Sequence, residues 1–456
     1  MSEARQGAAV TGTEAGGTAA EGTDAERTAE GTEAEGTASA DSAVSGTAVS
    51  GAEVAGAEVA DPGPGSGDAI AARRVAEEFR ELYGADPDGV WAAPGRVNLI
   101  GEYTDFNDGF VLPLALPHTA LAAVARRADG VLRLHSADVS QGVVELGPDG
   151  LVPGSGTGWA AYPAGVVHVL RGAGHEIPGA DIHLSSTVPT GAGLSSSAAL
   201  EVVTALALND LYGLGLPHAE LAVLAQRAEN EFVGVPCGIM DQMASACATA
   251  GHALYLDTRD LGRRQVPFDL AGHGLRLLVV DTRVKHALGD GAYAERRAGC
   301  EAGARALGVR ALRDVPYGEL PAALDRLAEA GESDDVRAFV RHVVSDDHRV
   351  EQVIALLDAG DVRAVGPVLT EGHASLRDDL RVSCPELDLV VSAATAAGAL
   401  GARMTGGGFG GSAIVLVEET EAAAVTKSVE EAFAAAGYTA PRVFPATASR
   451  GAHRVL

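Results

Sequence analysis

Lysine is nearly missing from this sequence, and acidic residues far outnumber basic ones. Only Lys285 and Lys427 are lysines, and 34 basic residues stand against 62 acidic residues, which gives a formal net charge of −28. This charge argues against a polyanion such as nucleic acid as the main partner. It does not exclude small anions, because backbone N–H groups and a bound metal ion can hold a phosphate on an acidic protein.

Cysteines and long apolar runs are also scarce. The four cysteines, at positions 237, 247, 300 and 384, form no CxxC pair and show no metal-ligand spacing. We therefore expect reduced cysteines that serve as packing residues in a cytoplasmic protein. No basic start is followed by an apolar segment, and no apolar run reaches about 20 residues. We expect neither a signal peptide nor a membrane span.

Residues 1–67 lack aromatic side chains altogether. They consist almost entirely of Ala, Gly, Thr, Ser, Val, Glu and Asp, with near-repeats such as AEGTEAEGTA, and their basic residues are Arg5 and Arg27. Such a segment buries too little apolar surface to offset the entropy of ordering its chain. The composition predicts a disordered, acidic, low-complexity tail over residues 1–67.

The remaining residues show helix and strand patterns. Asp68 is a candidate N-cap, apolar residues follow at helical spacing, and Gly84 is a stop signal. Strand-like runs then alternate with helical stretches, and the overall hydrophobic content of 46% is enough for a sizeable core. The mixture predicts an α+β or α/β protein with two lobes, at residues 68–275 and 276–456, and with a hinge near residues 265–280.

The segment VPTGAGLSSSAALEV (residues 188–202) carries the first of three glycine-bearing patterns. Glycines allow close backbone approach, and the free N–H groups at the start of the following helix favour an anion. A phosphate site and an ordinary capped helix both remain open here. Neither lysine follows a glycine loop, so a Walker P-loop is excluded. A dinucleotide fingerprint requires glycine where Ser196 stands, and its acidic residue is better placed on a strand than late in a helix, where Asp210 falls.

The segment ENEFVGVPCGIMDQMAS (residues 229–245) contains two candidate acids. Asp241 follows an apolar turn, so it is either a partly shielded catalytic carboxylate or the N-cap of the next helix. Glu229 lies at the end of a helix, where a carboxylate is unfavourable with the helix dipole unless a cation binds it.

The segment GARMTGGGFGGSAIVLV (residues 401–417) has five glycines in six positions before a predicted strand. Ordering so many glycines costs considerable chain entropy. The run is therefore either a floppy connection or a close packing surface for a ligand or another backbone, and its end in a buried strand favours the second.

A fourth segment, GRVNLIGEYTDFNDGFVLP (residues 95–113), places an arginine, two acids and a threonine among glycines and asparagines. Together with the three patterns above, it resembles the GHMP kinases, and within that superfamily the galactokinases, over residues 70–450. VKHALGDGAYAERR (residues 284–297) and HASLRDDLRVSCPELD (residues 373–388) also resemble galactokinase segments, and all six matches occur in the family's order.

The resemblance implies an α+β protein of two lobes, with an N-terminal mixed α+β domain and a C-terminal domain around an antiparallel sheet. It further implies ATP-dependent phosphorylation of the anomeric hydroxyl of α-D-galactose, which gives galactose 1-phosphate and ADP in the first committed step of galactose catabolism. ATP and Mg²⁺ are the implied co-substrate and metal, galactose and MgATP are the implied partners, and the protein is expected to be a monomer without nucleic-acid or membrane partners.

The resemblance also assigns site residues. Arg96 and Asp241 match the catalytic pair. The sugar contacts are Glu102, Tyr103, Thr104, Asp105, Gly238 and Tyr293; the ATP phosphate loop is Gly191, Ala192, Gly193, Leu194, Ser195, Ser196 and Ser197; the magnesium ligands are Ser197 and Glu229. Short carboxylates suit a sugar, because each can pair with two hydroxyl groups.

Two residues depart from the family pattern. Tyr103 stands where histidine is usual, and Phe106 stands where tyrosine is usual, so the exact sugar is open. One alternative is a GHMP kinase for another sugar, such as an N-acetylated galactose. The other is a non-catalytic, galactokinase-like sugar sensor, against which the intact phosphate loop, Arg96, Glu229 and Asp241 argue.

Overall fold

The computed structural model describes residues 66–154, 158–284 and 291–456. The predicted acidic tail therefore lies outside the described residues, apart from its last two positions, which belong to the first helix. That helix, α1, spans Ser66–Tyr83 and ends before Gly84, whose φ of 75° suits a residue without a side chain. The prediction that Asp68 is its N-cap is wrong, because the helix begins two residues earlier.

The other helices and the strands follow in chain order. The helices are α2 (Ala161–Gly172), α3 (Ser196–Tyr212), α4 (His218–Arg227), α5 (Met240–Cys247), α6 (Ala292–Leu307), α7 (Leu320–Glu329), α8 (Asp334–Asp358), α9 (Val365–Ser375), α10 (Pro385–Ala396) and α11 (Ala422–Ala436). Two π-helical segments, Ala228–Val233 and Leu376–Leu380, follow α4 and α9 directly.

The strands are β1 (Gly89–Asn98), β2 (Phe110–Val111), β3 (Pro113–Arg126), β4 (Leu132–Ser136), β5 (Val144–Leu146), β6 (Ala180–Ser186), β7 (His252–Asp257), β8 (Arg263–Pro267), β9 (Leu275–Asp281), β10 (Gly401–Thr405), β11 (Ser412–Glu418), β12 (Arg442–Ala446) and β13 (His453–Arg454). They form a six-stranded sheet in the order β13-β1-β3-β6-β4-β5, a four-stranded sheet in the order β10-β11-β9-β12, and a three-stranded sheet in the order β2-β7-β8. The six-stranded sheet is mixed, because β4 and β6 run parallel while its other pairs are antiparallel.

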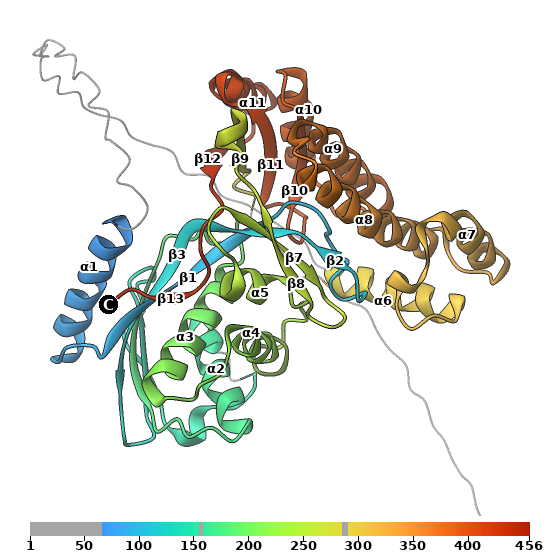
Figure 1. Ribbon diagram of the computed structural model, residues 1–456. Helices are drawn as coiled ribbons and strands as arrows, with labels where there is room; N and C mark the ends of the chain where they lie inside the picture. The colour runs from blue at the N-terminus through green and yellow to red at the C-terminus, as the bar shows by residue number, and fades with distance from the viewer. Residues whose placement is uncertain (1–65, 155–157, 285–290) are drawn as a thin grey trace, which may run out of the picture. The chain divides into compact units, whose positions relative to one another are not determined.

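The six-stranded sheet is covered on both faces. Side chains alternate between the faces of a strand, and β1 sends Trp91 and Val97 into the core shared with α2–α5, while Val90 and Ala92 pack against α1. Figure 1 shows α1 in blue on one side of this sheet and α2–α5 in green on the other. Burial on both faces explains why every residue of β1 is buried.

The four-stranded sheet is antiparallel throughout and carries a second core. Val280, Val415 and Phe433 belong to this core, which β9–β11 share with α6, α8, α10 and α11. The last strand, β13, does not join this sheet but pairs with β1, so the end of the chain returns to the first sheet (Figure 1).

The sequence patterns located most elements correctly. The strand-like runs VLRLHSA, ADIHLSS, LRLLVVDT and SAIVLVE contain β4, β6, β9 and β11, and the helical stretches that begin near residues 196, 219 and 422 are α3, α4 and α11. The α+β architecture is confirmed, whereas the division at residue 275 stays a prediction. All four cysteines are described and free of disulfides. Within the described ranges, no helix is both long and apolar enough to cross a membrane.

A buried acid on α8 leads to a stability prediction. Burial, with Asp346 as a further cause, raises the pKa of Asp347 to about 8, and one of its carboxylate oxygens has no hydrogen-bond partner. In the unfolded chain this group ionises near pH 4, so between pH 4 and 8 the folded state binds the proton more tightly. Stability from this group is thus complete below pH 4 and is lost as the pH rises to 8.

Asp347→Asn removes this loss of folding stability at higher pH, because asparagine does not ionise. We expect its stability relative to the wild type to improve by about 4 kcal/mol between pH 5 and pH 8.5. Thermal melts at the two pH values measure it, with the exposed Asp325→Asn as a matched control. An effect of Asp347→Asn that is the same at both pH values would contradict the prediction.

Candidate active site

Most of the predicted site residues line one cavity. They come from β1 and the segment after it, the loop before α3 and the first turn of α3, the π-helical segment after α4, the start of α5 with the residues before it, and the start of α6. The predicted residues that line it are Arg96, Glu102, Tyr103, Asp105, Gly191, Gly193, Leu194, Ser195, Ser196, Ser197, Glu229, Gly238, Asp241 and Tyr293. Segments up to about 200 residues apart in sequence thus meet at one place.

Thr104 and Ala192 are predicted contacts that the structure does not bring to this cavity. The Thr104 hydroxyl lies 2.9 Å from the carbonyl oxygen of Gly101 and 2.7 Å from that of Phe110, so it stabilises the bend of its own loop. The carbonyl oxygen of Ala192 accepts a hydrogen bond of 2.8 Å from the Ser412 hydroxyl.

Arg96 and Asp241 form a two-pronged ion pair at the centre of the cavity. Nε and Nη2 of Arg96 each lie 2.8 Å from a different carboxylate oxygen of Asp241, which fixes both planar groups in one orientation. Nη1 of Arg96 donates to the carbonyl oxygen of Gly193 at 2.7 Å. The Arg96 side chain is 5% exposed, whereas that of Asp241 is 27% exposed. Asp241 is the second residue of α5, so it is not the N-cap.

The loop before α3 reaches the same aspartate. The Ser195 hydroxyl donates to Asp241 Oδ2 at 2.6 Å, and Ser195 has a left-handed φ of 59° just before the helix. Gly191 and Gly193 also have positive φ values, which glycine tolerates best. The N-terminus of α3, with its unpaired N–H groups, therefore lies beside the Arg96–Asp241 pair and can hold an anion. Asp210 accepts a hydrogen bond from Trp91 far along α3, so nothing here supports a dinucleotide site.

The late glycine run packs against this loop. A side chain on Gly406 would stand 2.8 Å from the carbonyl oxygen of Gly193, and one on Gly411 would stand 3.0 Å from that of Ala192. Both glycines have positive φ values. The expectation that this run forms a close packing surface against another backbone is confirmed, and Gly406 and Gly407 extend the lining of the cavity.

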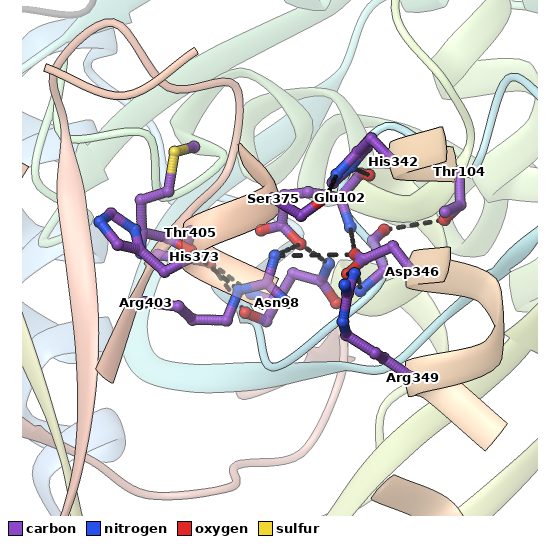
Figure 2. A network of polar contacts seen from close by, with 12 residues as sticks. Asn98, Glu102, Thr104, His342, Asp346, Arg349, His373, Ser375, Arg403 and Thr405 are labelled. Atoms are coloured by element: carbon purple, nitrogen blue, oxygen red, sulfur yellow. Dashed lines mark hydrogen bonds and ion pairs between the residues drawn. The ribbon is translucent and has the colours of Figure 1, made fainter. Parts of the chain in front are cut away.

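Glu102 is almost fully buried beneath the cavity, with 1% of its surface exposed. Its Oε1 accepts from the backbone N–H of Gly406 at 2.7 Å, and its Oε2 accepts from Arg403 at 3.1 Å and from the Asn98 amide (Figure 2). Burial raises the pKa of Glu102 to about 7, although Arg403 and the Gly406 N–H oppose the rise.

Asp105 and Gly238 fit each other. A methyl group on Gly238 would overlap the Asp105 carboxylate, so only glycine permits this approach. The backbone N–H of Met240 donates to Asp105. Burial and the nearby Asp241 together raise the pKa of Asp105 to about 6. Asp105 and Asp241 thus face the cavity close together, which suits a ligand that donates hydrogen bonds.

Tyr103 adopts a left-handed backbone, with φ of 65°, and its hydroxyl donates to the carbonyl oxygen of Gly407 at 2.6 Å. Its ring contacts those of Phe106 and Tyr293, with centroids 5.9 and 5.1 Å away. The hydroxyl proton is therefore used within the protein, which leaves the phenol oxygen an acceptor for a ligand. Phe106 packs in this aromatic group without needing a hydroxyl.

Glu229 lines the cavity beside the N-terminus of α3. It accepts hydrogen bonds from the Ser197 hydroxyl and, at 2.7 Å, from the Gln242 amide. Burial and the charge of Asp241 raise its pKa to about 7. Glu201 and Gln242 each leave one buried side-chain oxygen without a hydrogen-bond partner beside it. Such a concentration of oxygens fits a hard cation.

Sequence reasoning missed several residues of the site. Val235, Pro236, Cys237 and Met240 line the cavity as well. Gln242 and Arg403 bind the carboxylates of Glu229 and Glu102. The first four lie inside a segment that was singled out, so their place could be anticipated from Gly238 and Asp241.

Comparison with known proteins decides the family. Residues 161–249 match the GHMP kinases N terminal domain, residues 353–435 match the GHMP kinases C terminal model, and residues 77–126 match the galactokinase galactose-binding signature. A galactokinase of Streptomyces coelicolor is 69% identical over 390 residues, which cover 86% of this chain and 100% of that protein. The chain belongs to the galactokinase family. It is a sugar kinase of the GHMP kinase superfamily.

More distant relatives agree with this assignment. A galactokinase of Roseiflexus is 43% identical over 388 residues, covering 84% of this chain and 97% of that protein. The solved structure of Lactococcus lactis galactokinase complexed with galactose superposes with a TM-score of 0.79 and 32% identity, over 84% of this chain and 99% of that chain. A mevalonate kinase of Methanococcus jannaschii, at 19% identity and a TM-score of 0.58, shares the fold.

Proposed function

We propose that the protein catalyses the ATP-dependent phosphorylation of the anomeric hydroxyl of α-D-galactose, which gives α-D-galactose 1-phosphate and ADP. The single observation that carries this proposal is the position of the Arg96–Asp241 pair. On one side of this pair lie Glu102 and Asp105, two acids suited to sugar hydroxyls. On the other side lies the glycine loop of residues 191–197, at the N-terminus of α3. The membership of the galactokinase family supports galactose as the sugar.

On the sugar side, Asp105 is the more available acceptor. Glu102 already receives three protein hydrogen bonds, so it has fewer lone pairs left for a ligand. Tyr103 adds a phenol oxygen, and Tyr293 and Gly238 complete this end of the cavity. A site with such acceptors penalises sugars that leave a carboxylate without its hydroxyl partner.

On the catalytic side, Asp241 accepts a hydrogen bond from the attacking hydroxyl and so increases the electron density on its oxygen. Arg96 keeps that carboxylate oriented, because two of its N–H groups bind it. A third binds Gly193, so two of the five remain for the oxygens of the transferring phosphoryl group. Phosphoryl transfer depends chiefly on such alignment and charge stabilisation.

On the nucleotide side, residues 191–197 and the N-terminus of α3 would hold the phosphates of ATP through backbone N–H groups and serine hydroxyls. Ser197 and Glu229 would hold Mg²⁺, which binds through one or two protein oxygens together with substrate phosphates. When bound, the ion supplies positive charge to the phosphate oxygens. In the part of the chain that the structure describes, no group of three or more His, Cys, Asp or Glu side chains could hold a metal ion alone.

We also propose that the protein acts as a cytoplasmic monomer. Its cysteines form no disulfide, and the large apolar side chains exposed among the described residues are scattered singly. Light scattering at a mass other than about that of one chain, 46.1 kDa, would refute the monomer.

A panel of sugars tests the reaction. The full-length protein with ATP and Mg²⁺ is expected to release ADP fastest with galactose, and more slowly with glucose, mannose and N-acetylgalactosamine. A preference for another sugar would replace galactose as the substrate, and the absence of ADP release with every sugar would favour a sugar sensor. Tyr103→His in the same panel shows whether the departure at this position affects the ranking.

A further inference from the structure

Arg403 of β10 is a fully buried cation that no role in the reaction has yet explained. Its side chain is 0% exposed, and Arg403 is the middle residue of the strand that leads into the late glycine run. Nη2 donates to Glu102 Oε2 at 3.1 Å, and Nη1 donates to the carbonyl oxygen of Leu99 at 3.3 Å. Figure 2 shows Arg403, Glu102 and Asp346 within one polar network.

The backbone around Glu102 is held separately by α8. Asp346 accepts from the N–H groups of Gly101 and Glu102 at 3.1 Å each, and Nε2 of His342 donates to the carbonyl oxygen of Glu102 at 3.0 Å. Three contacts from α8 therefore fix the main chain at Gly101 and Glu102, while Arg403 binds the Glu102 carboxylate and the carbonyl oxygen of Leu99. This separation means that a change at Arg403 alters the charge and aim of the Glu102 side chain more than the path of its loop.

The charges around Glu102 come from three elements. Arg403 lies on β10, Asp346 and His342 lie on α8, and Arg96 lies on β1. Burial lowers the pKa of His342, which favours its neutral form. Asp346 raises the pKa of Glu102, whereas Arg403 lowers it more strongly than Arg96 does. A buried carboxylate without a paired cation takes up a proton instead of remaining charged. Arg403 is therefore the main reason that Glu102 can face the cavity as an anion.

We propose that Arg403 is a positioning residue for sugar binding, which holds the Glu102 carboxylate charged and directed toward the cavity. The inference rests on the proposed role of Glu102 in binding the sugar. Arg403 itself is not among the residues that line the cavity.

The experiment measures KM for galactose between pH 5.5 and 9.5 in the wild type and in Arg403→Met, which keeps the apolar bulk but loses the charge. Loss of the cation raises the pKa of Glu102 further, so Glu102 stays protonated to higher pH. We expect KM for galactose to rise about fivefold or more at pH 7 in Arg403→Met and to recover as the pH rises. The pH below which KM increases should move upward by one unit or more, while KM for ATP changes less than threefold.

Arg403→Lys keeps the charge and should keep the wild-type pH profile. Arg276→Met, on strand β9 of the same sheet and 42% exposed, is the matched control and should leave both KM values unchanged. If Arg403→Met does not fold, Arg403→Gln takes its place, because glutamine is also uncharged but can still donate a hydrogen bond in the buried site. A threefold or greater rise in KM for galactose alone supports the proposal, and an unchanged KM overturns it.

Glu102→Gln separates this inference from the proposed function. If Glu102→Gln leaves KM for galactose unchanged, then the sugar-binding role of Glu102 is wrong. If Glu102→Gln weakens galactose binding but Arg403→Met shows the wild-type KM and pH profile, then only the inference about Arg403 is overturned. Titration calorimetry with galactose alone gives the same comparison without turnover.

Discussion

Asp241→Asn is expected to lower kcat by about 10³-fold or more while the protein still folds and binds galactose. Asparagine keeps the shape of the side chain but loses the negative charge that draws the attacking hydroxyl and pairs with Arg96. A positioned general base or charged acceptor contributes roughly 10²–10⁴-fold to a rate. Loss of the two-pronged ion pair also releases Arg96 from its orientation, which adds to the effect.

The measurement is steady-state ADP release together with galactose binding by calorimetry. Arg96→Ala should lose turnover to a similar extent, because it leaves Asp241 without its partner. The exposed Asp325→Asn on α7 changes the same functional group away from the cavity and should retain wild-type kcat. Turnover within tenfold of the wild type in both site variants would remove the Arg96–Asp241 pair from the mechanism.

Gly238→Ala should raise KM for galactose by about 10- to 100-fold with a smaller change in KM for ATP. The added methyl group overlaps the Asp105 carboxylate, which must then leave its position beside the Met240 N–H. A hydrogen bond to a charged group contributes about 1.5–3 kcal/mol, and each 1.4 kcal/mol is a factor of ten in affinity.

Gly172→Ala is the matched control, because a side chain there meets no atom within 4 Å and the substitution is neutral for the site. Kinetics with galactose and ATP varied separately distinguish the two ends of the cavity. If KM for galactose stays at the wild-type value while the variant folds normally, then Asp105 does not bind the sugar in the position proposed.

The local patterns in the sequence were sufficient for the loop before α3 and for the elements that flank it. Glycines, serines and the apolar run after them are neighbours in the chain, so their geometry follows from local rules. The same holds for the late glycine run, whose end in β11 indicated close packing. The resemblance to a known family, rather than the pattern, supplied the roles of Arg96 and Glu102.

The buried residues that hold Glu102 in place could not be predicted from local sequence patterns. Arg403 stands in a strand of otherwise ordinary composition, and its partner Glu102 lies 301 residues earlier. Asp346 and His342 lie in a long helix rich in charged residues, where they look like solvent-exposed side chains, yet both are 0% exposed. Which charged residue of such a helix faces inward depends on tertiary packing, and no local spacing encodes it.

The return of β13 to β1 has a consequence for the order in which the protein forms. The backbone of Val90 pairs with residues 455 and 456, so β1 lacks its partner on that side until these residues have been made. During synthesis, the N–H and C=O groups on that edge stay open to water and to other chains for the time needed to translate more than 350 further residues. The strand that carries Arg96 is thus translated long before the strand that covers its outer edge.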